Sequence, residues 1–124
     1  MKKRDDIVYL YHIIESIELI EQFVEGIDIG DFIDNKMIHS AVIRQLEIIG
    51  EASKLVSDDL KNKYTAIPWK IMGDMRNILI HEYFGVDLAA VWDTVKNDIP
   101  KLKQDVNEII ESEEKYEDNS TRKS

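Results

Sequence analysis

Residues 76–83, RNILIHEY, place an arginine, an asparagine, a histidine and a tyrosine within one short segment. An arginine guanidinium stays charged at any working pH and presents a planar fork of donors that suits a phosphate. A histidine can accept or donate a proton near neutrality, because its unperturbed pKa is about 6.5. Arg76 and His81 facing one phosphodiester are therefore the minimum for metal-free RNA cleavage, in which Asn77 could orient the imidazole or bind a phosphate oxygen.

The spacing of these residues sets a geometric condition on such a site. Successive residues of an α-helix are rotated by about 100°, so Arg76 and His81 lie about 140° apart around one helix. The long arginine stem, a loosening of the helix near His81, or a second copy of the chain could bring the two groups together. The third option would place the site in a groove shared by two protomers on a two-fold axis.

A purely structural role is the alternative for the same segment. Arg76 would pair with an acid, His81 would cap a helix C-terminus, and Tyr83 would pack with its hydroxyl outward. Asp74 lies seven residues before His81 and shares its helix face with Asn77. The local pattern alone does not separate these interpretations, so the elements that carry the segment have to be considered.

The apolar residues recur with helical spacing along nearly the whole chain. This periodicity predicts long helices over residues 5–25 and 35–56, and a third helix from Pro68 to Gly85 that contains RNILIHEY. A final helical segment begins after Asp87, and Pro100 predicts a kink or break at residues 97–99. Ser57 and Asp87 are candidate N-caps, Pro68 suits a first helical turn, and Gly85 is a candidate C-cap.

Four main helices with short connections predict an all-α fold, an up-and-down bundle of four or five helices. We expect one domain over residues 1–112. Residues 113–124 continue an acidic run, ESEEKYED at 111–118, and are expected to form a disordered tail. Trp69, Trp92, Phe84 and the methionines are expected in the core rather than in a site.

Composition limits the cellular setting and the partners. The chain has 124 residues, no cysteine and a formal net charge of −9. The missing cysteines exclude disulfides and thiolate metal sites and fit a reducing compartment. The N-terminus lacks the pattern of a signal peptide and no stretch is apolar enough for a membrane span, so we expect a cytoplasmic protein. The acidity argues against a basic surface that coats nucleic acid, but it allows a small basic cleft.

A second group of polar residues lies on the helix predicted over 35–56. Glu47 and Glu51 are one turn apart, with Gly50 between them and Arg44 one turn earlier. They could support Arg76 or His81, or they could form ordinary helix-surface pairs. Gly50 inside a helix predicts a close approach of another helix. In contrast, His12 and His39 show no metal-ligand spacing and are expected to be incidental.

Arg76-x4-His81-x-Tyr83, with Asn77 directly after the arginine, resembles the R-x4-6-H signature of the HEPN superfamily. More narrowly, the chain resembles the HepT-like toxins, or DUF86 proteins, of HEPN–MNT toxin–antitoxin pairs. The similarity also covers AVIRQLEIIGEASKLVS at 41–57, IPW at 67–69, MRNILIHEYFGVD at 75–87 and VWDTVKNDIPKL at 91–102. It extends over about residues 4–110.

The resemblance implies a homodimeric bundle of four or five helices with a metal-independent ribonuclease site in the dimer cleft. Arg76 and His81 match the catalytic pair, and Asn77 matches the polar residue that follows the arginine. Tyr83 matches the tyrosine that the partner antitoxin, a minimal nucleotidyltransferase (MNT), modifies with AMP. The resemblance also hints at a supporting position for Glu47 and Glu51. It implies RNA as the substrate, no cofactor and no membrane.

These observations favour the toxin of a type VII toxin–antitoxin pair. The main rival is a non-catalytic dimeric module that docks a nucleotidyltransferase and uses Arg76 only to bind a nucleotide phosphate. A third possibility is a bundle that binds a nucleotide or another small phosphate ligand in its cleft. The net charge of −9 is the feature of this chain that differs most from what is typical of RNA-binding proteins.

Overall fold

The computed structural model describes residues 2–74 and 87–122. These residues contain no β-strand, which confirms the prediction of an all-α fold. In chain order they form α1 (Lys2–Val24), α2 (Ile29–Asp34), α3 (Lys36–Leu55), α4 (Asp58–Lys63), a helical turn over residues 69–74, α6 (Leu88–Asp93), η2 (Thr94–Asp98) and α7 (Ile99–Arg122). None of the helices described is long and apolar enough to cross a membrane.

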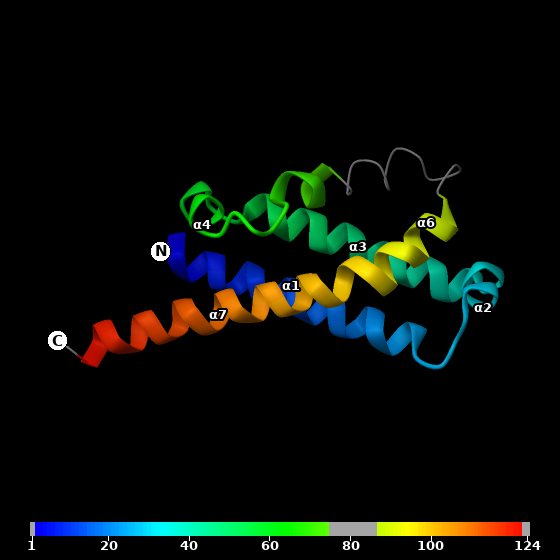
Figure 1. Ribbon diagram of the computed structural model, residues 1–124, viewed down its shortest axis with the longest axis horizontal. Coiled ribbons are helices and arrows are strands. Elements are labelled where there is room, and N and C mark those ends of the chain that lie inside the picture. The colour runs from blue at the N-terminus through cyan, green and yellow to red at the C-terminus, as the bar shows by residue number, and fades with distance from the viewer. Residues whose placement is uncertain (1, 75–86, 123–124) are drawn as a thin grey trace.

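Three long helices, α1, α3 and α7, lie side by side and form the body of the bundle (Figure 1). Both α3 and α7 run antiparallel to α1. An ion pair of 2.8 Å between Lys103 of α7 and Glu21 of α1 fixes one end of the α1–α7 pair, and a hydrogen bond from the Tyr11 hydroxyl to Glu114 fixes the other. This antiparallel packing is the up-and-down arrangement that the short connections predicted.

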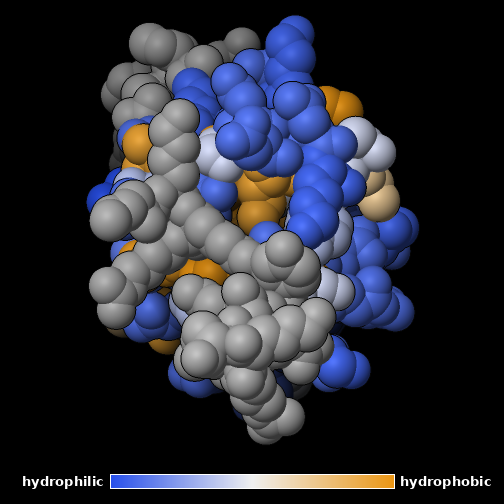
Figure 2. Space-filling model, turned by 90° about the vertical axis from the view of Figure 1, so that its left-hand side faces the viewer, coloured by the Kyte–Doolittle hydropathy of each residue, from blue (hydrophilic) through white to orange (hydrophobic). Residues whose placement is uncertain are grey.

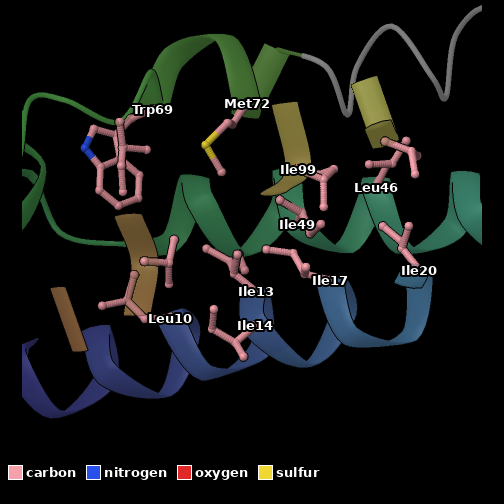
Figure 3. Packing of buried hydrophobic residues seen from close by; sticks show 14 of the residues in the cluster. Leu10, Ile13, Ile14, Ile17, Ile20, Leu46, Ile49, Trp69, Met72 and Ile99 are labelled. Carbon is pink, nitrogen blue, oxygen red and sulfur yellow. The ribbon is translucent and has the colours of Figure 1, made fainter. Parts of the chain in front are cut away.

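One cluster of buried aliphatic side chains fills the space between these helices (Figure 3). Leu10, Ile13 and Ile17 of α1 are completely buried, as is Ile49 of α3. They recur at three- and four-residue spacing because this spacing keeps side chains on one helix face. Apolar residues at helical spacing, as predicted from the sequence, therefore pack α1 against α3.

Local capping signals explain where several helices begin. The Asn35 side chain accepts a hydrogen bond of 3.1 Å from the Ile38 N–H at the start of α3. Ser57 caps α4 and Asp87 caps α6, as predicted from their residue types. The connection after α1 contains a helix that the sequence did not predict: α2 has six residues and begins with a capping box formed by Asp28 and Asp31.

Pro100 was expected to kink or break the helix at residues 97–99, but the helical backbone continues through them with a π-helical turn before the proline. Residues Thr94–Asp98 form the π-helical turn η2, in which the Ile99 N–H donates to the Thr94 carbonyl. Proline lacks an N–H and clashes with the carbonyl four residues before it, so the wider turn accommodates the ring while the helix continues into α7.

The C-terminal segment differs from the expectation of a disordered tail at residues 113–124. Helix α7 continues through this segment to Arg122. Glu113 is buried, with only 5% of its surface exposed, because Lys63 and Tyr64 both donate hydrogen bonds to it. At the end of the bundle that carries α4, the coloured part of the surface is largely hydrophilic, with hydrophobic surface visible between the polar side chains (Figure 2).

Candidate functional site

The described residues include helical elements that surround the predicted site in the sequence, but not its reactive side chains. Arg76, Asn77, His81 and Tyr83 lie outside the described residues, as does the predicted C-cap Gly85. What the structure does describe is the helical turn that leads into this segment, the face of α3 that carries Glu47 and Glu51, and Asp74.

The helical turn over residues 69–74 is fixed to the core by two side chains. Trp69 and Met72 are 8% and 6% exposed and point from this turn toward α1 and α3 (Figure 3). Pro68 comes directly before the turn, and its carbonyl accepts a hydrogen bond of 3.1 Å from the Met72 N–H. The Trp69 indole N–H donates to the Tyr64 carbonyl at 2.9 Å. The turn is thus fixed by the hydrogen bonds and the burial of Trp69 and Met72, both of which precede residue 75.

This turn lies close to the C-terminal part of α3. A Cβ atom added at Gly73 would come within 2.9 Å of Cγ of Lys54. The lack of a side chain at Gly73 therefore permits the turn to lie this close to α3. The Ser53 hydroxyl donates to the Ile49 carbonyl at 2.7 Å and lies 4.0 Å from Sδ of Met72. Gly50 is buried on the same helix. The close helix approach predicted at Gly50 itself stays a prediction.

Asp74, predicted as a supporting residue, ends the described part of this turn. Its side chain is 55% exposed and lies 4.0 Å from Nζ of Lys70, one helical turn earlier. This exposed pair contributes little to stability. Asp74 therefore remains available to solvent on the surface of the turn.

The structure brings Glu47 and Glu51 together at one groove of about 380 Å³ between α1 and α3. Tyr9 and His12 of α1 and Arg44 of α3 also line it. Asp74 does not line this groove, so the predicted supporting residues divide between two places in the described structure. Arg44 Nη1 and Glu47 Oε2 are 3.2 Å apart, which is the surface pair that the one-turn spacing allowed.

His12, which was expected to be incidental, lies at this groove. It is 35 positions before Glu47 in the chain, and only the antiparallel packing of α1 on α3 brings the two to one surface. No spacing signal could have found it. His39, also expected to be incidental, has a structural role: its Nδ1 lies 3.1 Å from the Phe32 carbonyl, which joins α3 to α2.

Hydrogen bonding to glutamates shifts the pKa of two residues near the turn that leads to Arg76. The bond to Glu113 raises the pKa of Lys63, and burial together with the same carboxylate raises the pKa of Tyr64. Lys63 stays protonated and charged, and Tyr64 stays a hydroxyl donor, throughout the neutral range. On the other side of α7, the bond to Glu114 raises the pKa of Tyr11.

An antiparallel all-α bundle in a chain that carries Arg-x4-His at residues 76–81 fits the HEPN superfamily that the sequence resembles. Comparison with known proteins specifies the family. The chain belongs to the HepT-like family, described as "Ribonuclease HepT-like", whose model matches residues 13–109. That range contains Arg76 and His81 as well as Glu47 and Glu51.

Several named relatives are similar over most of this chain. A Methanocaldococcus jannaschii protein named "Putative RNase MJ1380" is 51% identical over 110 residues, which cover 89% of this chain and all of that protein. A Thermococcus cleftensis protein named "Probable ribonuclease HepT" is 54% identical over 101 residues, 82% of this chain and 92% of that protein. No solved structure matches the chain.

One of the relatives is longer than this chain and includes sequence that this chain does not match. The Methanocaldococcus jannaschii protein named "Gamma-glutamylcyclotransferase and putative RNase MJ0434" is 48% identical over 117 residues. The match covers 94% of this chain but only 53% of that protein. The chain thus spans about half the length of this relative.

Proposed function

We propose that this chain is the toxin of a type VII HEPN–MNT pair and acts as a metal-independent endoribonuclease. The observation that carries the proposal is the match to a ribonuclease family over residues 13–109, a range that contains Arg-x4-His at 76–81. Relatives that are named as ribonucleases and are about half identical to this chain support the reaction class.

The proposed reaction needs one proton-transfer group and one fixed cation. His81 accepts the proton of the ribose 2′-OH as this oxygen attacks the neighbouring phosphorus, or it protonates the 5′-oxygen that leaves. Arg76 stabilises the negative charge that builds up on the pentacoordinate phosphorus. The bond from phosphorus to the 5′-oxygen breaks, so the products are a 2′,3′-cyclic phosphate and a 5′-hydroxyl end. No cofactor enters this scheme.

A homodimer would complete the site. Arg76 and His81 diverge by about 140° on an ideal helix, and two copies across a shared cleft would let one protomer's groups complement the other's. In this proposal Asn77 and Asp74 orient the reactive groups. Glu47 and Glu51, which share the groove on α3, act as supporting residues.

Tyr83 is the proposed point of control. A cognate MNT nucleotidyltransferase would transfer AMP to its hydroxyl, which places a bulky negative phosphate on the segment that carries Arg76. The phosphate would compete with RNA for the arginine and occupy the space of the substrate. We place both proteins in the cytoplasm, where RNA and ATP are available.

Cleavage of total cellular RNA by the purified protein in EDTA tests the enzyme. The wild type is expected to cut RNA, and His81→Ala is expected to leave it intact. His39→Gln serves as the matched histidine control and should cut like the wild type, because the described contacts of His39 are with the carbonyl and the ring of Phe32. Loss of cutting in EDTA that is restored by a divalent metal would contradict the metal-independent mechanism.

The same preparation separates the rival function. If the wild type leaves RNA intact and its Tyr83 carries no AMP by mass spectrometry, the chain is a docking module rather than a nuclease. Intact RNA with AMP on Tyr83 would show that the silenced form was purified. In that case the Tyr83→Phe variant decides between the two functions. It lacks the hydroxyl that would accept AMP, so it should cleave RNA and resist neutralisation by the antitoxin.

A further inference from the structure

Three helical elements meet at Tyr64. Its backbone N–H donates to the Leu60 carbonyl at 3.0 Å and so ends α4. Its carbonyl accepts the Trp69 indole N–H at 2.9 Å, which joins it to the turn over residues 69–74. Its hydroxyl donates to Glu113 of α7 at 2.7 Å. One residue thus connects α4, α7 and the turn that precedes Arg76.

The partner of the hydroxyl is itself held firmly. Glu113 is buried, and its Oε2 atom also accepts a hydrogen bond of 2.9 Å from Nζ of Lys63. A carboxylate is buried in a protein only when charge and hydrogen bonds compensate its lost hydration. Glu113 therefore gives the Tyr64 hydroxyl a fixed attachment point on the long helix α7.

Two neighbouring side chains, those of Lys63 and Tyr64, fasten this connection to Glu113 of α7. Residues 63–67 form one wall of a hollow of about 350 Å³, and Asp105, Glu108, Ile109 and Ser112 of α7 form the other. Because this space is not filled by side chains, dispersion contacts across it are few. The hydroxyl bond to Glu113 is consequently a main fastening of this connection.

The position of the connection limits the position of Arg76. Trp69, bonded to Tyr64, begins the turn that ends the described segment at Asp74. Arg76 follows Asp74 by two residues, and two extended residues span at most about 7 Å. A shift of the turn would therefore move the point from which the guanidinium reaches its phosphate.

We propose that Tyr64 is a positioning residue for RNA cleavage, which it serves by holding the turn over residues 69–74 against α7 through Glu113. The inference rests on the proposed function, because it assigns Tyr64 a role in placing Arg76. Displacing a reacting group by about 1 Å can cost about 100-fold in rate. Loss of one fastening should cost less, because Trp69 and Met72 still anchor the turn in the core.

Tyr64→Phe is the test, and Tyr11→Phe is its matched control. Both remove one hydroxyl that donates to a glutamate of α7, Glu113 and Glu114 respectively, but only Tyr64 is bonded to Trp69. Both variants are assayed well below their melting temperatures for kcat and KM on RNA. Amide hydrogen exchange is followed in the peptide that covers residues 69–74.

We expect Tyr64→Phe to lower kcat about 10-fold with faster exchange at residues 69–74, and Tyr11→Phe to change neither. Glu113→Gln should behave nearly like the wild type, because its amide oxygen still accepts the hydroxyl. An unchanged kcat and exchange in Tyr64→Phe, even with a lower melting temperature, would overturn the positioning role. If the wild type cuts no RNA and its Tyr83 carries no AMP, the proposed function fails, and exchange alone decides whether Tyr64 holds the turn.

Discussion

The Asp6 carboxylate accepts two hydrogen bonds from Ser57, one from the backbone N–H at 2.7 Å and one from the hydroxyl at 2.5 Å. The two residues are 51 positions apart in the chain. The same Ser57 oxygen accepts a bond of 3.3 Å from the Leu60 N–H at the start of α4. Asp6 is 3% exposed, so this pair joins the beginning of α1 to the beginning of α4 inside the protein.

Removing this carboxylate should destabilise the fold. Asp6→Ala leaves the part-buried Ser57 N–H without its acceptor, and losing hydrogen bonds to a charged group costs about 2–3 kcal/mol. We expect that decrease in the free energy of unfolding by urea. The neighbouring Asp5 is exposed, so Asp5→Ala should change it by less than about 0.5 kcal/mol. Equal effects of the two changes would show that the Ser57 bonds contribute nothing.

The turn after α1 depends on the backbone freedom of glycine. Gly26 has φ of 75°, and no atom would lie within 4 Å of an added Cβ. Gly26→Ala should therefore cost about 1 kcal/mol through backbone strain alone. Gly26→Asn should cost less, because asparagine tolerates this region better. Gly30→Ala, inside α2, is the comparison and should stay within about 0.5 kcal/mol in the same urea titration.

Alkaline pH should weaken the attachment of α4 to α7. The pKa values of Tyr64 and Lys63 are raised in the folded protein by Glu113 and, for Tyr64, by burial. Groups with raised pKa values stabilise the fold fully below their unfolded pKa, about 10 for both, and lose that contribution as pH rises through the folded value. The urea midpoint should thus fall above about pH 10, and less steeply in Tyr64→Phe. A pH dependence identical in the two proteins would refute this assignment.

Glu47 and Glu51 allow a test that separates support of the site from surface pairing. Arg44 is largely exposed in its pair with Glu47, so Glu47→Gln should change stability by less than about 0.5 kcal/mol. If the two glutamates support the ribonuclease site, Glu47→Gln and Glu51→Gln should each lower kcat by about 10-fold. Arg44→Gln breaks the same pair and keeps Glu47, so it should retain more activity. Wild-type kcat in both glutamine variants would reduce the two glutamates to surface residues.

The helices and their starts follow from local sequence. The three- and four-residue spacing that includes Leu10, Ile17 and Ile49 predicts α1 and α3 because it concerns neighbours on one helix face. Ser57 and Asp87 were predicted as caps because a cap needs only its own side chain and the next turn. The Arg76–His81 spacing and the similar sequence segments around it likewise identified the family from the sequence alone.

The remaining features depend on contacts between distant residues. The acidic run after Glu111 has the composition of a solvated tail, yet Glu113 is buried because Lys63 and Tyr64, about fifty residues earlier, donate to it. His12 reaches the groove of Glu47 and Glu51 only because α1 packs antiparallel to α3. Sequence by itself determined the long helices and the caps at Ser57 and Asp87, since those are local properties, although it did not predict α2. The tertiary structure alone decided which polar groups meet, because burial and pairing depend on how the helices pack.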